Sequence, residues 1–235
     1  MNKKFLNIIL FLIGVLLLFK PPSDPDFGWH YKYGEYLFQN HQILRQNTFS
    51  YTSTDYVWAN SYWVAELVLY ILFISTGAVG MGLILSVIMS GIVIWLLDRV
   101  GAKGFGKSLS AILFFTLIGR TAVTVRPLYF STLFLLVLIY ILVHRRRWQF
   151  LLPPMFMLWA NTHADFTIGL FIYAVFTAFE LFQLLRNYRQ PHKLLSFTVF
   201  PVLSVLATLI NPYGINLWTT LLKETHYFQF SHISE

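Results

Sequence analysis

Apolar runs as long as a membrane is thick recur through most of this chain, and they leave few folds open to it. A transmembrane helix needs about 20 mostly apolar residues, with a range of about 17 to 25. Because the backbone cannot bond to water inside a bilayer, runs of this length are expected to be helical. The sequence therefore predicts an all-α, polytopic membrane bundle of about seven transmembrane helices, near residues 5–20, 64–97, 108–124, 128–143, 148–162, 166–185 and 195–210.

The composition supports a membrane protein and excludes other classes. Charged residues make up 11% of the chain, against about 25% in a soluble domain. The net charge is +7, but the basic residues gather in short clusters between apolar runs, as orientation signals do in membrane proteins. We therefore expect no nucleic-acid partner. The chain has no cysteine, so carboxylates, histidines and hydroxyls are the groups available for chemistry.

The basic clusters predict the orientation. Lys3 and Lys4 precede the first apolar run, and no small-residue cleavage site follows that run, so we interpret residues 1–20 as a retained first helix. Further clusters lie within residues 99–107, 145–147 and 186–193. If all of them face the cytoplasm, the chain is a multi-pass protein of the inner (plasma) membrane with a cytoplasmic N-terminus.

The run at 64–97 is too long for one simple span, and residues 75–80 (STGAVG) interrupt it. In the interpretation we favour, residues 58–74 form an interfacial helix on the outer face and only residues 80–98 cross the membrane. In the alternative, residues 63–77 are a span, which puts either the preceding loop or the next basic cluster on the unexpected side.

We expect residues 1–235 to form a single transmembrane domain. Its parts are the first helix at 1–20, an outer loop with amphipathic helices at 21–79, transmembrane helices 2 to 7 at 80–212, and an outer segment at 213–235. Because the chain stops in a polar segment, we expect it to be the N-terminal part of a longer protein. The expected partners are the lipid bilayer and either another membrane protein or a missing C-terminal half.

The outer loop holds the first candidate site, because carboxylates are costly at bilayer depth and cheap in a loop. Asp24 and Asp26 are bracketed by Pro25 and Gly28, which together favour a stiff turn. Asp26 could act as a general base near the membrane surface. Equally, Asp24 or Asp26 could cap a helix that begins near Phe27.

Aromatic residues follow these acids. Trp29, His30 and the tyrosines after them could stack on a sugar ring, or could form an interfacial aromatic belt without a ligand. On a helix, His30 would share a face with Asp26, which could give a metal pair, a proton relay or a local hydrogen bond. Two ligands alone make a weak metal site. We therefore assign no metal ligand and no certain cofactor, and leave a divalent cation open.

Two later loops on the same side carry further polar residues. Arg120 and Arg126 could pair with the phosphate of a lipid carrier, or extend towards ordinary headgroups. His163 and Asp165 lie at a helix end, where Asp165 is either a second acid of the site or the cap of a helix that starts at Phe166.

These motifs, in this order, resemble the GT-C superfamily of polyprenyl-phosphate-sugar-dependent glycosyltransferases. More narrowly, they resemble bacterial multi-pass proteins distantly similar to its protein-mannosyltransferase and lipid A aminoarabinose-transferase branch. The stretches that carry the resemblance are each short but span almost the whole chain: residues 24–30 (DPDFGWH), 47–52 (NTFSYT), 57–58 (VW), 63–67 (WVAEL), 126–127 (RP), 159–163 (WANTH) and 211–214 (NPYG).

The resemblance implies a seven-helix module with a long first outer loop, an acid in that loop as base or acceptor-orienting group, and a polyprenyl-phosphate sugar as donor. Asp26 matches the acid, and Arg126 is a candidate for the carrier phosphate. The second acid that several members have in the next outer loop has no counterpart between Arg120 and Pro127. We expect a glycosyltransferase acting on the extracytoplasmic face. The alternatives are a transporter of a lipid-linked substrate and a non-catalytic or truncated membrane subunit.

Overall fold

The computed structural model describes residues 2–23, 25–46, 59–118, 125–187 and 192–230. Within these ranges every regular element is a helix, which confirms the all-α class. The elements are α1 (Lys3–Leu18), α2 (Phe27–Asn40), α3 (Trp63–Arg99), α4 (Gly104–Leu113), the π-helix η1 (Phe114–Ile118), α6 (Leu128–His144), the 3-10 helix η2 (Arg146–Leu151), α7 (Leu152–Ala160), α8 (Phe166–Asn187), α9 (His192–Ala207) and α10 (Asn216–Phe230).

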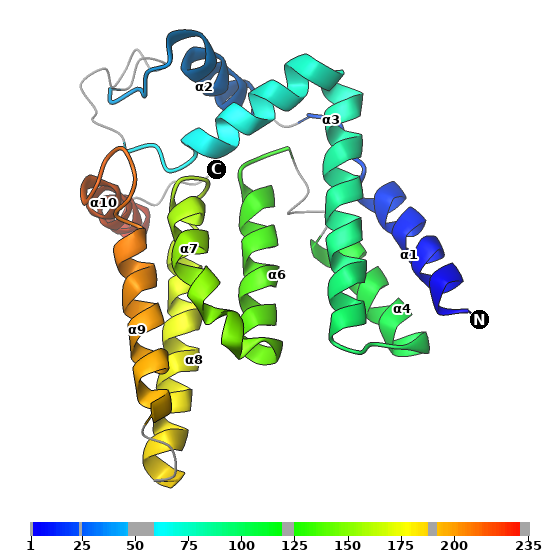
Figure 1. The fold of residues 1–235 in the computed structure, drawn as a ribbon. Helices are drawn as coiled ribbons and strands as arrows, with labels where there is room; N and C mark the ends of the chain where they lie inside the picture. Colours follow the sequence, from blue (N-terminus) through cyan, green and yellow to red (C-terminus); the bar gives the residue numbers. More distant parts are fainter. Residues whose placement is uncertain (1, 24, 47–58, 119–124, 188–191, 231–235) are drawn as a thin grey trace.

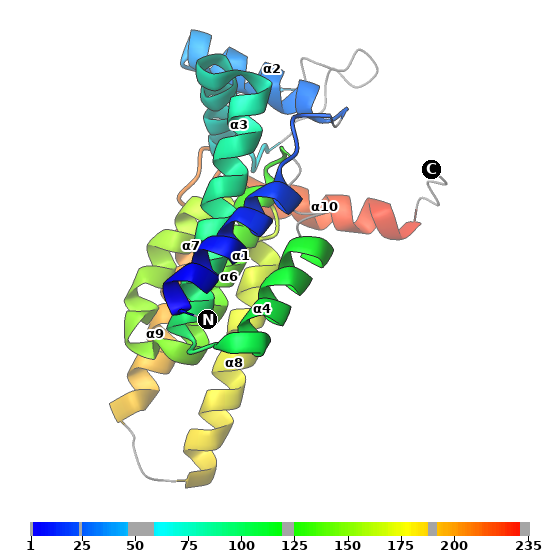
Figure 2. The ribbon, with the colours of Figure 1, turned by 90° about the vertical axis from the view of Figure 1, so that its right-hand side faces the viewer.

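Most of these helices run between two ends of the molecule (Figure 1). The chain passes from one end to the other through α1, returns through the second part of α3, and continues to alternate through α4 with η1, α6, α7, α8 and α9. As the side view in Figure 2 shows, α10 projects sideways from the bundle, and α2 lies across one end. We call this the α2 end and the opposite end the basic end.

The basic end takes its name from the four predicted clusters of basic residues. Lys3 and Lys4 begin α1, residues 99–107 join α3 to α4, residues 145–147 join α6 to α7, and Arg186 lies in the last turn of α8. These junctions lie at the same end of the bundle (Figure 1). The prediction that all four clusters lie on one side is therefore consistent with the fold.

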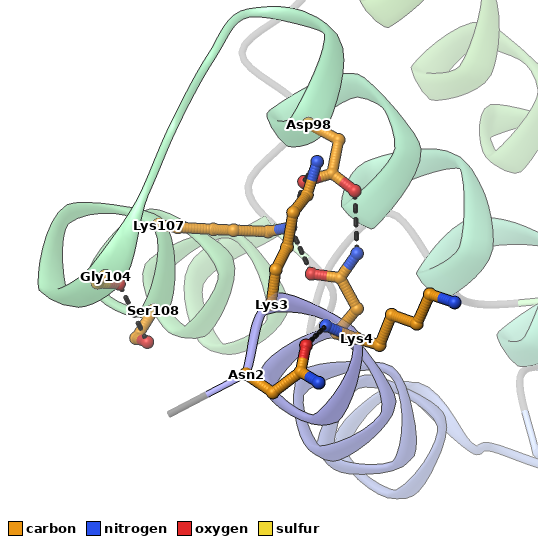
Figure 3. Close-up of polar contacts among 8 residues, drawn as sticks. Asn2, Lys3, Lys4, Asp98, Gly104, Lys107 and Ser108 are labelled. Carbon is orange, nitrogen blue, oxygen red and sulfur yellow. Dashed lines mark hydrogen bonds and ion pairs between the residues drawn. The ribbon is translucent and has the colours of Figure 1, made fainter.

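Asp98 lies where α1, α3 and α4 meet at the basic end (Figure 3). Its carboxylate accepts hydrogen bonds from Lys107 Nζ and from Asn7 Nδ2, both at 2.6 Å, and lies 3.3 Å from Lys3 Nζ. Lys107 is only 1% exposed and also donates to Asn7 Oδ1. A buried ammonium is costly unless it is paired and hydrogen-bonded, so this cluster holds the three helices together.

Helix α3 bends at Gly77, inside the interruption that the sequence predicts at 75–80. Gly77 has φ 69° and ψ 178°, a backbone conformation that is essentially restricted to glycine. Before the bend the helix runs across the α2 end, and after it the helix runs along the bundle (Figure 1). The predicted break is confirmed, while the placement of the first part on a membrane surface stays a prediction.

The start of α3 differs from the prediction, which placed a helix from residue 58. The helix begins at Trp63, because Asn60 forms a turn in which its side-chain Oδ1 accepts the Tyr62 N–H at 2.8 Å. Asparagine side chains compete with helical bonding in this way. The turn leaves Asn60 and Tyr62 at the α2 end, just before the first turn of α3.

Two hydrophobic cores share α6. One joins α6 to α1, α3, α4 and η1, and the other joins it to α7, α8 and α10. Buried polar side chains link α6 to its neighbours: Tyr129 Oη donates to the Leu85 carbonyl and Trp159 Nε1 donates to Ser131 Oγ, each at 2.8 Å.

Two of the described helices are long and apolar enough to cross a membrane, Trp63–Arg99 and Phe166–Leu184. Shorter apolar helices lie at Gly104–Leu117, Leu128–His144 and Thr198–Ala207. Helix α8 exposes large apolar side chains along much of its length. They are Ile168, Phe171, Val175, Phe179 and Phe182.

Two predicted segments have a different local structure. The run at 148–162 begins as the 3-10 helix η2 and becomes α-helical only at Leu152, with prolines in the first turn of α7, where their missing N–H groups cost nothing. The run at 108–124 begins earlier, at Gly104, and changes to the π-helix η1 at Phe114. Helix α10, within the predicted outer segment at 213–235, was not expected.

Candidate functional site

The two residues to which the sequence analysis gives the central roles contact each other at the α2 end. Asp26 precedes α2, and Arg126 lies two residues before α6. Arg126 Nη2 lies 3.1 Å from Asp26 Oδ2. The side chain of Asp26 is 57% exposed and that of Arg126 is 37% exposed. The fold therefore brings a predicted base and a predicted phosphate ligand together at a solvent-accessible position.

The alternative role of Asp26, as the cap of α2, can be tested from its side chain. Asp26 occupies the N-cap position but has αR backbone angles and makes no side-chain cap hydrogen bond. Its carbonyl oxygen accepts the N–H groups of Trp29 and His30. Since the backbone rather than the carboxylate meets the helix start, the carboxylate is left to pair with Arg126.

His30 does not join Asp26 through its side chain, as a metal pair or relay would require. Its Nδ1 lies 3.0 Å from Oε1 of Glu66, in the first turn of α3. The other carboxylate oxygen, Oε2, accepts a hydrogen bond from Asn60 Nδ2 at 2.6 Å. Glu66 is 1% exposed, so these two partners are what make a buried carboxylate tolerable there.

Glu66 is the residue of this site that the sequence analysis missed. It belongs to a stretch that carries the family resemblance, but was given no role. The signal was available, because an acid within a long apolar run must have a partner.

Helices α2 and α3 approach closely at Gly34. A Cβ atom at this position would lie 2.3 Å from the Glu66 carbonyl oxygen and 2.6 Å from the Tyr70 Cβ. Only a residue without a side chain allows this contact, which sets the distance between His30 and Glu66.

A second histidine and carboxylate lie in the turn between α7 and α8. His163 Nδ1 is 3.2 Å from Asp165 Oδ2 and also 3.2 Å from the Asp165 backbone nitrogen. A ring with Nδ1 unprotonated accepts the N–H, whereas a ring with Nδ1 protonated donates to the carboxylate. Both contacts use Nδ1, and the carboxylate of Asp165 faces His163 rather than capping α8.

The ring of Tyr62 lies next to both histidines. Its centroid is 5.9 Å from that of His30, in an edge-on arrangement, and 5.2 Å from that of His163. Residues from α2, from the turn before α3 and from the α7–α8 turn thus meet around one aromatic ring.

Asn161 fixes these segments relative to one another. Its Oδ1 accepts from Trp63 Nε1 at 2.8 Å, its carbonyl accepts the Val64 N–H, and its Nδ2 donates to the carbonyls of Met157 and Ile210. One buried amide therefore connects the start of α3, the end of α7 and the segment after α9. This network supplies a rigid support for the residues around Tyr62.

Two tyrosines near Glu66 stay protonated at physiological pH. Burial raises the pKa of Tyr213 to about 12, and burial together with the nearby charge of Glu66 raises the pKa of Tyr33 as well. The neutral hydroxyl of Tyr213 donates to the Leu44 carbonyl at 3.0 Å. Tyr213 thus ties the segment after α9 to the segment that directly follows α2.

The remaining predicted site residues are not part of this cluster or lie outside the described residues. Trp29 is 46% exposed on α2. Asp24 and Arg120 lie outside the residues that the structure describes. Within the described ranges, no group of three or more His, Cys, Asp or Glu side chains has an arrangement that could hold a metal ion.

Comparisons of the chain with protein-family models, with curated proteins and with solved structures find no match. The relationship to the GT-C superfamily thus stays a prediction from the sequence motifs. Chemically, the α2 end offers a carboxylate beside a guanidinium, together with two imidazoles next to an aromatic ring.

Proposed function

We propose that this protein is a membrane glycosyltransferase that moves a sugar from a polyprenyl-phosphate carrier to an acceptor on the extracytoplasmic face. The observation that carries the proposal is the contact between Asp26 and Arg126, two residues far apart in the sequence and named for complementary roles. The reaction needs one group to take a proton and another to stabilise a departing phosphate, and this pair supplies both.

In the proposed reaction, a hydroxyl oxygen of the acceptor attacks the anomeric carbon of the sugar. The bond from that carbon to the carrier phosphate breaks, its electron pair goes to the phosphate oxygen, and the hydroxyl proton goes to Asp26. Arg126 binds the phosphate through charge-assisted hydrogen bonds. Because phosphate and Asp26 compete for the same guanidinium, carrier binding would release the Asp26 carboxylate to accept the hydroxyl proton.

The proposed setting is a multi-pass protein of the inner membrane with its N-terminus in the cytoplasm. Each passage of the chain between the α2 end and the basic end is a proposed membrane crossing, about seven in all. The α2 end then faces outward, with α2 and the first part of α3 at the membrane surface. The gathering of the basic clusters at the opposite end supports this orientation.

The test measures the transfer of radiolabelled sugar from a mixed pool of polyprenyl-phosphate sugars by membranes that contain the protein. We expect Asp26→Asn to reduce transfer by about 100-fold or more at matched expression, since general-base catalysis contributes about that much. Glu35→Gln is the matched control: this acid also lies in α2, but its partner is the exposed Lys32. It should transfer like the wild type.

Persistence of transfer in Asp26→Asn would remove Asp26 as the base. If the wild-type chain transfers no sugar from the pool, the proposal fails and a non-catalytic membrane subunit is favoured.

A further inference from the structure

We propose that His30 and His163, with the ring of Tyr62 between them, bind the sugar of the carrier-linked donor. This inference rests on the proposed function, because it assigns a substrate group to the same end of the molecule. The proposed function assigns residues to the phosphate and to the proton, whereas this inference assigns residues to the sugar.

Each of the two imidazoles contacts the protein through one ring nitrogen. Both rings use Nδ1 for their protein contacts, His30 towards Glu66 and His163 towards Asp165. In the part of the chain that the structure describes, neither Nε2 atom makes a hydrogen bond. An imidazole held through Nδ1 presents Nε2 in a fixed direction, by the same geometry that orients metal-binding histidines.

The chemistry of a sugar ring matches what this cluster presents. Sugar hydroxyls both donate and accept hydrogen bonds, so they can pair with an Nε2 atom in either protonation state. The C–H groups on the face of a sugar are attracted to the electron-rich face of an aromatic ring. Tyr62 lies within contact distance of both imidazoles, so stacking and hydrogen bonding would act on one ring at once.

The position of the cluster relative to Arg126 favours the sugar of the donor. His30 follows Asp26 by one turn of α2, which is about 5.4 Å along the helix. Asp26 in turn contacts Arg126, the proposed ligand of the carrier phosphate. A sugar attached to a phosphate at Arg126 would therefore extend towards His30 and Tyr62.

The structure also separates positioning residues from contact residues. Glu66 is almost fully buried and reaches a ligand only through His30, so it is a positioning residue. His30 and His163 each have a side-chain exposure of 16%, which is enough for contact with a ligand.

The experiment uses carbethoxylation of histidines by diethyl pyrocarbonate in membranes that contain the wild-type protein, quantified at each histidine by mass spectrometry. The probes are a pool of polyprenyl-phosphate sugars and, as the control, polyprenyl phosphate without a sugar. We expect the sugar-bearing pool, at about ten times its Kd, to slow modification of His30 and His163 about tenfold. His144 is exposed at the basic end and serves as the internal reference.

The absence of protection at His30 and His163, or equal protection by the sugar-free carrier, would overturn the inference. The variant Tyr62→Leu adds a second measurement: it should lose the protection, whereas Phe38→Leu, at an exposed aromatic residue of α2, should keep it. Protection that persists in Tyr62→Leu contradicts a role for this ring. Circular dichroism and thermal unfolding in detergent at wild-type values show that either variant is folded.

The two proposals can fail separately. Sugar-specific protection without any transfer would support the sugar site and contradict the transferase. Transfer without protection would support the transferase and contradict the sugar site.

Discussion

At the scale of single residues, the burial of a charge decides how much its ion-pair partner contributes to the stability of the fold. Asp98 and Glu180 each pair with a basic residue at the basic end, but Lys107 is almost fully buried whereas Arg146 is 49% exposed. Replacing Asp98 by alanine leaves a buried ammonium without its counter-charge and should reduce the free energy of unfolding by about 3–5 kcal/mol. Glu180→Ala should cost less than about 1 kcal/mol, because its partner keeps access to water.

Denaturation of the purified protein in detergent, followed by circular dichroism, measures both values. Equal losses for Asp98→Ala and Glu180→Ala would show that the buried ammonium does not depend on Asp98.

Single residues also show what the sequence could reveal. Asp26 and Arg126 were predicted from their chemical type and loop position, and the fold brings them into contact. Their pairing with each other was not predictable, because it depends on how the segment before α6 meets the start of α2. Glu66 was missed although an acid in an apolar run is a detectable signal. Its partner His30 was instead expected to interact with Asp26, from helical spacing alone.

At the scale of elements, the approach of α2 to α3 depends on Gly34. In Gly34→Ala the new methyl group would overlap the Glu66 carbonyl, so the helices must separate, at a cost of about 1–3 kcal/mol. Gly28 lies on the same helix, and a Cβ there meets nothing within 4 Å. Gly28→Ala should therefore be neutral or stabilising by up to about 1 kcal/mol.

The difference between these two variants in thermal unfolding in detergent measures the close contact itself. If Gly34→Ala is as stable as Gly28→Ala, α2 does not pack on α3 in this way.

Helices could be predicted where a single apolar run has the length of one helix. The helix predicted at 128–143 is observed as Leu128–His144, and the one predicted at 166–185 as Phe166–Asn187. Prediction was weaker where a side chain competes with the helix, as Asn60 does before α3. Prediction was also weaker for α10, because this helix contains no long apolar run. Tertiary packing of Leu217 into a hydrophobic core helps to stabilise it.

At the scale of the whole molecule, the order of the passages could be predicted because apolar runs and basic clusters alternate. The contacts at the α2 end could not, since they join turns separated by one or more helices. The bend at Gly77 affects both the order of the passages and the contacts at the α2 end. It lets α3 lie across the α2 end before running along the bundle, so that Glu66 meets α2 while Asp98 reaches the basic end.

This arrangement predicts on which side of a membrane each part lies. The chain has no cysteine, so single cysteines can be introduced without a background. We expect Glu35→Cys and Ser75→Cys to react with a membrane-impermeant maleimide in intact spheroplasts, and Arg147→Cys to react only after permeabilisation. If the first part of α3 crossed the membrane instead, the cysteines at 35 and 75 would react from opposite sides. Labelling of both cysteines from the same side therefore requires the part of α3 before the bend to lie along the membrane surface.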